Sequence, residues 1–275
     1  MNKFKLTNPD KILFPKEKLT KLDIFNYYLE INNLMLPYIE NRLLSVIRCH
    51  DGINKEVFIK KHPSNDREYV NIILDENEEY FYINKDYQLL YQIQNGTLEF
   101  HTTSLPIKNK GTSIMIFDLD PDEKLPLNKL KAAVLLIKSL LDDLNLVSFL
   151  KTSGGKGFHI FIPFKKVKNS DKFYEFSKKI ALIAETKWPD VFTTNLKKEK
   201  RKNKIFIDYL RNNKKSTCVA PYSLRIREKA PISMPISWDK LKEIKPNEVT
   251  IKNYKKYLDN SWANFFNIDQ NLNYK

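Results

Sequence analysis

The stretch Thr112-Ser-Ile-Met-Ile-Phe-Asp-Leu-Asp120 is the most informative segment of this 275-residue chain. It is an apolar run that ends in two acids and is followed by Pro121. Such a run is typical of a buried strand whose polar end emerges at a site. Asp118 and Asp120 lie two residues apart, so on a strand both carboxylates point to the same face. The stretch therefore predicts a core strand and a candidate site together.

The flanking sequence predicts an α+β fold. Helical patterns cover residues 20–36, where Thr20 and Asp23 resemble a capping box, and residues 88–93, 126–144 and 171–186. Extended patterns cover residues 45–49, 56–61, 96–101, 148–152, 158–163 and 204–210. From residue 112 onward the order is strand, helix, hairpin, helix, strand, which predicts a largely antiparallel sheet with helices on one face. The tail beyond Trp238 is expected to be helix and loop packed on the core.

The two acids of the central stretch predict a metal site. Paired carboxylates repel each other, and a divalent cation is the usual way to offset that repulsion. Asp208, in Ile205-Phe-Ile-Asp-Tyr-Leu210, could supply a third ligand if its strand is a neighbour. Three carboxylates without His or Cys favour Mg²⁺ or Mn²⁺, and two such ions suit phosphoryl transfer. The alternative is that Asp118 and Asp120 only end a strand and cap the turn before Pro121.

A glycine-rich segment, Ser153-Gly-Gly-Lys-Gly-Phe-His159, offers phosphate-binding groups. Glycines let the backbone approach phosphates closely, while Lys156 adds charge and Ser153 a hydroxyl donor. The segment joins two strands and lacks the Walker A pattern. An ordinary hairpin is the alternative, and a lone strand histidine such as His159 is more often structural than catalytic.

Two arginines follow in Ala220-Pro-Tyr-Ser-Leu-Arg-Ile-Arg227. Arg225 and Arg227 alternate onto one face of an extended segment, and paired guanidiniums suit phosphate or carboxylate recognition. The alternative is a surface ion pair with an acid such as Glu228.

Charge and composition narrow the class of protein. The formal net charge of +14 raises affinity for polyanions, although a Lys-, Asn- and Ile-rich composition is also typical of AT-rich coding sequence. The longest apolar runs are too short to cross a bilayer, and the charged start shows no secretory signal. Cys49 and Cys218 lie far apart, so a thiolate zinc site is not expected and a reduced, cytoplasmic location is.

Taken together, these residues resemble the polymerase domain of bacterial ligase D, within the archaeo-eukaryotic primase superfamily. The matching pieces run in the family's order over residues 6–242. They include Leu6-Thr-Asn-Pro-Asp-Lys-Ile-Leu-Phe-Pro15, Ser45-Val-Ile-Arg-Cys-His-Asp-Gly52, Glu99-Phe-His101, Phe117-Asp-Leu-Asp-Pro121, Lys151-Thr-Ser-Gly-Gly-Lys-Gly-Phe-His159 and Ile207-Asp-Tyr-Leu-Arg-Asn212.

The resemblance implies a primase-type catalytic core of mostly antiparallel or mixed sheets flanked by helices. Residues 1–275 would form a single primase-polymerase domain of two fused α/β modules, with the catalytic motifs in residues 96–230. Asp118, Asp120 and Asp208 would bind two Mn²⁺ or Mg²⁺ ions. The resemblance places the incoming NTP or dNTP against His101 at the sugar, and against Ser153, Lys156, His159, Arg201, Arg225 and Arg227.

The same resemblance implies DNA contacts and partners. Lys11 and Lys21 match a basic pair that grips the 5′-phosphate at a gap, Phe58 matches an aromatic that stacks on a template base, and Arg48 is counted among the DNA contacts. The expected activity is templated addition, with a ribonucleotide preference, to 3′ ends at gaps, overhangs and breaks in non-homologous end joining. Ku, a separate DNA ligase and a nucleoid-associated location in a prokaryotic cell are expected, and no membrane.

One departure concerns sugar choice: Thr102-Thr103 follow His101, where family members often carry an aromatic residue or a proline. Two other functions stay open. A primase that starts chains without a primer is the first, although the tail lacks the cysteines that replicative primases add for iron–sulfur or zinc sites. A basic, non-catalytic scaffold that binds DNA ends is the second.

Overall fold

Four α-helices form where the sequence predicts them. The computed structural model describes residues 4–165 and 167–272. The helices are α1 (Lys21–Ile39), α2 (Asp86–Gln94), α3 (Leu127–Asp143) and α4 (Ser170–Lys187). Thr20 caps α1, and its side chain and that of Asp23 bond each other's backbone N–H, so the predicted capping box is confirmed.

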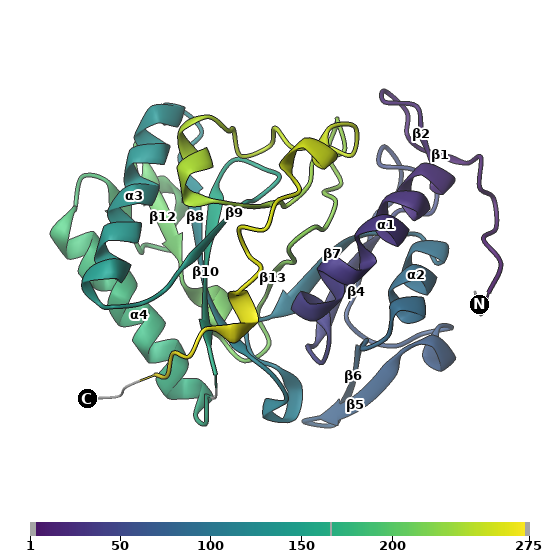
Figure 1. The fold of residues 1–275 in the computed structure, drawn as a ribbon, viewed down its shortest axis with the longest axis horizontal. Helices are drawn as coiled ribbons and strands as arrows, with labels where there is room; N and C mark the ends of the chain where they lie inside the picture. The colour runs from purple at the N-terminus through teal and green to yellow at the C-terminus, as the bar shows by residue number, and fades with distance from the viewer. Residues whose placement is uncertain (1–3, 166, 273–275) are drawn as a thin grey trace.

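The larger sheet has six strands in the order β11-β12-β8-β10-β9-β14 (Figure 1). The strands are β8 (Ser113–Pro121), β9 (Phe149–Thr152), β10 (Phe158–Phe164), β11 (Phe192–Thr193), β12 (Ile205–Asp208) and β14 (Pro235–Ile236). Only the β11–β12 pair is parallel. Most of the Thr112–Asp120 stretch forms the central strand β8, and its apolar residues are buried as predicted.

The second sheet has four strands in the order β13-β7-β3-β4. They are β3 (Leu44–Arg48), β4 (Phe58–Lys60), β7 (Thr97–Thr103) and β13 (Thr217–Val219). Two hairpins complete the described strands: β1 (Ile12–Phe14) with β2 (Leu19–Thr20), and β5 (Asn71–Asp75) with β6 (Glu78–Tyr82).

The division into two sheets bears on the prediction from the strand order. That order predicts one largely antiparallel sheet, and the strands after residue 112, apart from β13, do form one. However, β13 pairs with β7 in the other sheet, although it follows β12 in the chain. Periodicity identifies a strand but not its partner, so this crossing of the chain could not be read from the sequence.

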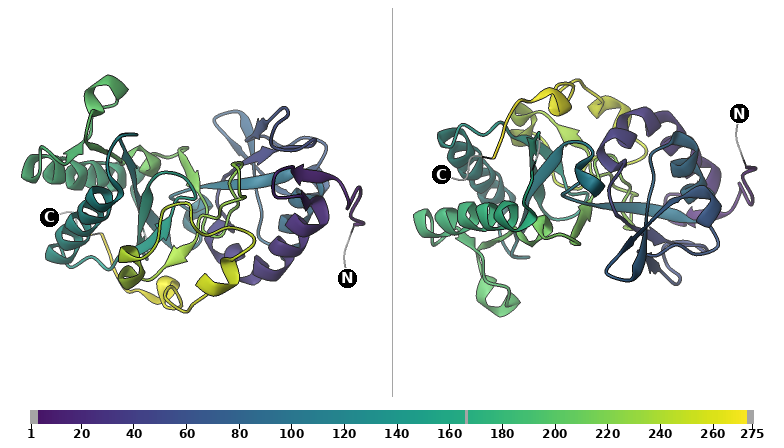
Figure 2. Two further views of the ribbon diagram at one scale, coloured as in Figure 1. Left: turned by 90° about the horizontal axis from the view of Figure 1, so that it is seen from above. Right: turned by 90° about the horizontal axis from the view of Figure 1, so that it is seen from below.

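The helices lie on the outer sides of the molecule. Figures 1 and 2 show α3 and α4 beside the six-stranded sheet and α1 with α2 on the opposite side, against the four-stranded sheet. Tyr28 of α1 shows how this packing works. Its ring meets Phe100 of β7 edge-on at 5.4 Å between centroids, and its hydroxyl donates to the Leu98 carbonyl. Because the helices lie on the outer sides, the surfaces between the two sheets are left free for a functional site.

The tail packs on the core as short helices and loop, as predicted, and it also connects the two modules. It contains three short 3₁₀ helices, Trp238–Lys242, Tyr254–Tyr257 and Phe265–Asn267. Trp262 stacks on Phe265 and touches both Tyr38 of α1 and Phe149 of β9. Aromatic burial of this kind is among the strongest contributions to a core, so the tail fixes the modules against each other.

Within the described residues, no helix combines the length and apolar character needed to cross a membrane. Cys49 and Cys218 are both buried free thiols.

Candidate nucleotide-binding cavity

A cavity of about 450 Å³ lies between the two sheets. The six-stranded sheet contributes the acids, and β7 and β13 of the other sheet contribute His101 and Cys218. Its lining includes every residue predicted to bind metal or nucleotide: His101, Asp118, Asp120, Ser153, Lys156, His159, Arg201, Asp208, Arg225 and Arg227. These residues are up to 126 positions apart in the chain, and the fold brings them to one place.

A second cavity, of about 350 Å³, lies between the β5–β6 hairpin and the start of α4. Its single acid, Asp75, already pairs with Lys214. It therefore offers no comparable set of chemical groups.

Strand pairing brings the three carboxylates together. Asp118 on β8 is directly opposite Asp208 on β12, so the two antiparallel strands present both acids at the same level. Asp120 lies two residues further along β8 and shares the Asp118 face. The strand of Asp208 is thus a neighbour of β8, which meets the condition for a three-acid set.

Arg211 lies among these acids. Its Nε is 3.4 Å from Asp118 Oδ2 and its Nη2 is 3.0 Å from Asp208 Oδ2. Burial opposes charge on Asp118, but the adjacent His159 and Arg211 hold its pKa well below the usual range. Burial, and then repulsion from Asp118, raise the pKa of Asp120, and the same two influences raise that of Asp208 against the pull of Arg211. Negative charge in the cavity is thus only partly compensated, a condition that a bound cation relieves.

His159 joins Asp118 to Cys218. Its Nε2 is 3.1 Å from Asp118 Oδ1 and its Nδ1 is 3.4 Å from the Cys218 sulfur. The three ligand atoms lie within 4.8 Å of one another, a spacing that could hold an ion. Both ring nitrogens are already engaged, however, and burial raises the pKa of the Cys218 thiol to about 11, so it is a poor metal ligand. We interpret this row as orienting Asp118, with His159 in the structural role common for strand histidines.

Lys151 lies behind this row, fully buried on β9. Its ammonium donates to the Ser233 hydroxyl and lies 5.1 Å from the centre of the Phe161 ring. Burial lowers the Lys151 pKa to about 7, because the charged ammonium is disfavoured away from water.

The glycine-rich turn between β9 and β10 presents backbone groups to the cavity. The Ser153 hydroxyl accepts hydrogen bonds from Gly155 N at 3.0 Å and Gly157 N at 3.2 Å. Gly157 is required sterically, because a Cβ there would lie 2.0 Å from the Leu119 carbonyl oxygen of β8. Lys156 is half exposed and pairs with Glu123 at 2.5 Å, so its ammonium stays at the cavity rim. This turn is more than a plain hairpin, because its polar groups line the same cavity as the acids.

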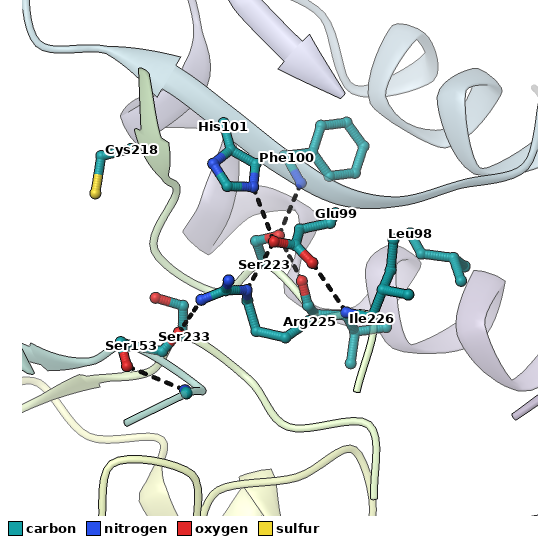
Figure 3. Close-up of polar contacts among 12 residues, drawn as sticks. Leu98, Glu99, Phe100, His101, Ser153, Cys218, Ser223, Arg225, Ile226 and Ser233 are labelled. Carbon is teal, nitrogen blue, oxygen red and sulfur yellow. Dashed lines mark hydrogen bonds and ion pairs between the residues drawn. The ribbon is translucent and has the colours of Figure 1, made fainter. Parts of the chain in front are cut away.

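Glu99 organises the opposite wall (Figure 3). Its buried carboxylate accepts from His101 Nε2 at 2.8 Å, Arg225 Nε at 2.7 Å and Ile226 N at 2.9 Å. Burial works against this charge, but its partners lower the Glu99 pKa to about 2. Arg225 also donates through Nη1 to the Ser153 carbonyl at 2.6 Å. The alternative, a surface ion pair of Arg225 with Glu228, is not what the structure shows, because Glu228 pairs with Lys16.

Two further arginines approach the cavity from other segments. Arg201 stacks over the Phe206 ring at 3.5 Å, donates to the Asn195 and Leu196 carbonyls, and lies 4.0 Å from Asp120. Arg227 lines the cavity next to Gly155. Each could meet an anion entering beside the acids.

The residues predicted to contact DNA lie in the other module. Lys11 pairs with Asp51, and Lys21 donates to the Gln94 carbonyl at 2.7 Å. Burial and the nearby Lys11 charge lower the Lys21 pKa, so the fold holds two cations close together. Phe58 begins β4, half buried, with its ring 5.8 Å from that of His50.

Arg48 does not fit a DNA-contact role. It is buried on β3, with Nη2 donating to Asp66 at 2.5 Å and to Gln92 at 2.9 Å. Its charge is used inside the module, because a buried guanidinium needs a buried acid. We therefore leave Arg48 out of the proposed DNA surface.

Sequence reasoning gave no role to Glu99, Arg211, Cys218 or Lys151, although three of them line the cavity or bond its lining. A signal existed for two of them. Glu99 shares a strand face with His101 two residues away, and Arg211 follows Asp208 by three residues. Cys218 and Lys151 carry no such signal.

Comparison with known proteins places the chain. The family model for the LigD primase-polymerase domain matches residues 20–265. The multifunctional non-homologous end joining protein LigD of Pseudomonas aeruginosa is 30% identical, over 98% of this chain and 33% of that protein. The bifunctional LigD protein of Bacillus subtilis is 31% identical, over 86% of this chain and 39% of that protein. The chain thus spans between a third and two fifths of the length of these curated relatives.

A solved structure agrees over the whole fold. The polymerase domain of Mycobacterium tuberculosis ligase D, in complex with DNA, superposes with a TM-score of 0.88 at 26% identity. The match covers 98% of this chain and 100% of that one. The α+β, primase-type architecture expected from the sequence is therefore confirmed.

Proposed function

The chain belongs to the LigD primase-polymerase family, and from this premise we propose that it is a template-directed nucleotidyltransferase. It would add nucleotides to 3′ ends at gaps, overhangs and breaks during non-homologous end joining. Residues 1–275 would act as a single catalytic domain.

The observation that carries this proposal is the meeting of two kinds of group in one cavity. Carboxylates of β8 and β12 line one part of it, and the Ser153 turn with Arg225 and Arg227 lines another. A nuclease would need the acids but not a set of groups suited to a triphosphate. A polymerase needs both, because the bond it forms lies between a 3′-hydroxyl and a nucleotide triphosphate.

Asp118, Asp120 and Asp208 would hold the metal ions. Their oxygen ligands and partly compensated charge fit Mg²⁺ or Mn²⁺. Two ions bound there would activate the attacking hydroxyl and neutralise the triphosphate. The protein's own part is to keep the acids aligned: β-sheet register fixes Asp118 opposite Asp208, and His159 holds Asp118 in place.

The nucleotide would lie along the wall formed by the glycine-rich turn. Backbone N–H groups, Lys156, Arg225 and Arg227 suit its phosphates, with Arg201 near the acids. His101, on the facing β7, would contact the sugar, and we propose that the pocket prefers ribonucleotides.

Lys11 and Lys21 would bind the 5′-phosphate of the downstream strand, and Phe58 would stack on a template base. Two neighbouring lysines provide a local positive site for a phosphate dianion, and base–aromatic stacking tolerates any sequence. Ku and a DNA ligase are the proposed partners, because added nucleotides must be joined after ends are held. A location at the nucleoid follows from the DNA substrate.

Primer extension across a short gap tests this function. A labelled primer is extended opposite each template base with each nucleotide, in Mn²⁺ or Mg²⁺, on gaps carrying a 5′-phosphate or a 5′-hydroxyl. We expect addition that follows the template and weakens without the 5′-phosphate. The Asp118→Ala/Asp120→Ala protein should bind DNA but add nothing.

Other outcomes point elsewhere. Tight binding of gapped DNA without addition in any metal would contradict catalysis and favour an end-binding scaffold. Chain synthesis on a template without a primer would instead favour a primase.

A further inference from the structure

Glu99 has three hydrogen-bond partners that belong to different parts of the cavity wall. It lies on β7, whose opposite face buries Leu98 and Phe100, with the Phe100 ring against Tyr28 of α1, so the strand cannot readily rotate. The Glu99 side chain points instead to the segment 223–227 (Figure 3). A buried carboxylate with three donors is a fixed point in the structure.

The hydrogen bond to Glu99 determines which ring nitrogen of His101 donates and which accepts. An ionised carboxylate only accepts hydrogen bonds, so the His101 Nε2 that it contacts must carry the proton. In a neutral ring, Nδ1 then presents a lone pair. Figure 3 shows the second ring nitrogen on the side turned toward Cys218, which also lines the cavity. That nitrogen is ready to accept a hydrogen bond from a hydroxyl group of a ligand.

The same carboxylate fixes Arg225. Glu99 holds Nε, while the Ser153 carbonyl holds Nη1, so the guanidinium spans from β7 to the glycine-rich turn. Packing against Gly154 is tight, since a Cβ at that glycine would lie 2.6 Å from Arg225 Cγ. The Arg225 side chain is therefore held in one conformation, and Glu99 fixes one end of its guanidinium.

We propose that Glu99 is a positioning residue that joins sugar recognition to triphosphate binding in one hydrogen-bonded unit. This role of Glu99 rests on the proposed function. Through His101 it makes the pocket sensitive to the 2′-hydroxyl of the nucleotide, and through Arg225 it holds a phosphate-binding group against the Ser153 turn.

Replacement of the carboxylate separates the two effects. In Glu99→Gln the side-chain amide can donate to His101, which removes the fixed polarity of the ring. We expect the NTP-to-dNTP ratio of kcat/KM to fall on the order of 10-fold, the size of one hydrogen bond. KM for both nucleotides should rise severalfold because Arg225 loses its charged partner, while kcat at saturation changes less.

A double-mutant cycle tests the unit directly. His101→Ala should abolish the sugar ratio, and adding Glu99→Gln to it should leave that ratio unchanged while still raising KM. Glu99→Asp retains an acceptor-only group and should keep a ratio closer to that of the wild type. Glu79→Gln is the matched control, because Glu79 bonds Arg67 on the surface and does not line the cavity. It should change neither quantity.

Calorimetric binding of ATP and dATP in Mn²⁺ gives a readout that does not need catalysis. If the wild type binds both but extends no primer, the proposed function fails while the cycle can still be read from the dissociation constants. If the wild type does not distinguish the two sugars, or Glu99→Gln leaves the ratio intact, the role of Glu99 is overturned. Should Glu99→Gln not fold, His101→Ala and Glu99→Asp decide the matter.

Discussion

Two buried arginine–carboxylate pairs lie on neighbouring strands of the four-stranded sheet, and they differ in what surrounds them. Arg48 on β3 pairs with Asp66 at 2.5 Å, with side chains 4% and 2% exposed. Arg225 pairs with Glu99 of β7 at 2.7 Å, with side chains 17% and 5% exposed. The first pair is enclosed on all sides, whereas the second opens onto the cavity. The same type of ion pair is therefore enclosed within one module in the first case and lies at the cavity wall in the second.

The largest effect is expected from breaking the enclosed pair. Arg48→Met would leave Asp66 as a buried acid without its cation, and removal of one partner from such a pair costs about 3–5 kcal/mol. Urea unfolding should show a loss of this size. Nucleotide affinity of the protein that remains folded should not change. Lost nucleotide affinity with unchanged stability would reverse the contrast between the two pairs.

Within residues 4–165 and 167–272, Lys151 differs from both arginines because it is a buried basic residue without an acid partner. Among the described residues, no carboxylate forms an ion pair with Lys151, and its pKa is lowered to about 7 by burial. The unfolded chain, with an ordinary lysine pKa of 10.5, binds more protons between pH 7 and 10.5, so unfolding free energy should rise with pH across that window.

The slope attributable to Lys151 is at most about 1.4 kcal/mol per pH unit. Denaturant unfolding of wild type and Lys151→Met at pH 7.5 and 9.5 measures it as a difference between the proteins. An identical pH dependence in both would show that Lys151 is not held at a depressed pKa.

Of the two buried arginine–carboxylate pairs, Gly154→Ala would disturb only the Arg225–Glu99 pair, which faces the cavity. Gly154 has φ +66°, and its added Cβ would meet Arg225 Cγ, so a penalty of about 1–2 kcal/mol and a severalfold rise in nucleotide KM are expected. Gly111→Ala is the matched control, because Gly111 also has a positive φ but open space around it. It should lower stability through its own backbone strain, without changing KM.

The smallest effect is expected at an exposed pair of the same type. Arg67 and Glu79 form a two-pronged contact at 2.6 and 3.0 Å on the surface. Because water screens such charges, Glu79→Gln should leave the unfolding free energy nearly unchanged. A loss as large as that of Arg48→Met would mean that burial does not govern these pairs.

Much of this architecture could be predicted from the sequence. Periodicity located α1 to α4 within three residues, and the apolar run with two acids identified β8. These features are local, since each depends on a repeat of 2 or 3.6 residues. Asp118, Asp208, Ser153 and Arg225 could be chosen because their residue types suit metal or phosphate.

The partners of charged residues could not be predicted in this way. Arg48 carries the residue type of a DNA contact, yet its partner Asp66 lies in a loop that bears no pattern. Glu99 reads as one acid in a strand, and only the long-range approach of Arg225, 126 positions later, gives it a role. Likewise, the chain leaves the six-stranded sheet after β12 so that β13 can pair with β7, and no local repeat in the sequence predicts this pairing.

We propose above all that the acids of β8 and β12 act on the nucleotide held by the facing wall. Single-nucleotide addition to gapped DNA by wild type and Asp208→Asn, with DNA affinity measured alongside, tests it most directly. We predict templated addition by the wild type and a loss on the order of 100-fold or more in Asp208→Asn, with DNA binding retained. Equal rates of addition by the two proteins would contradict the claim.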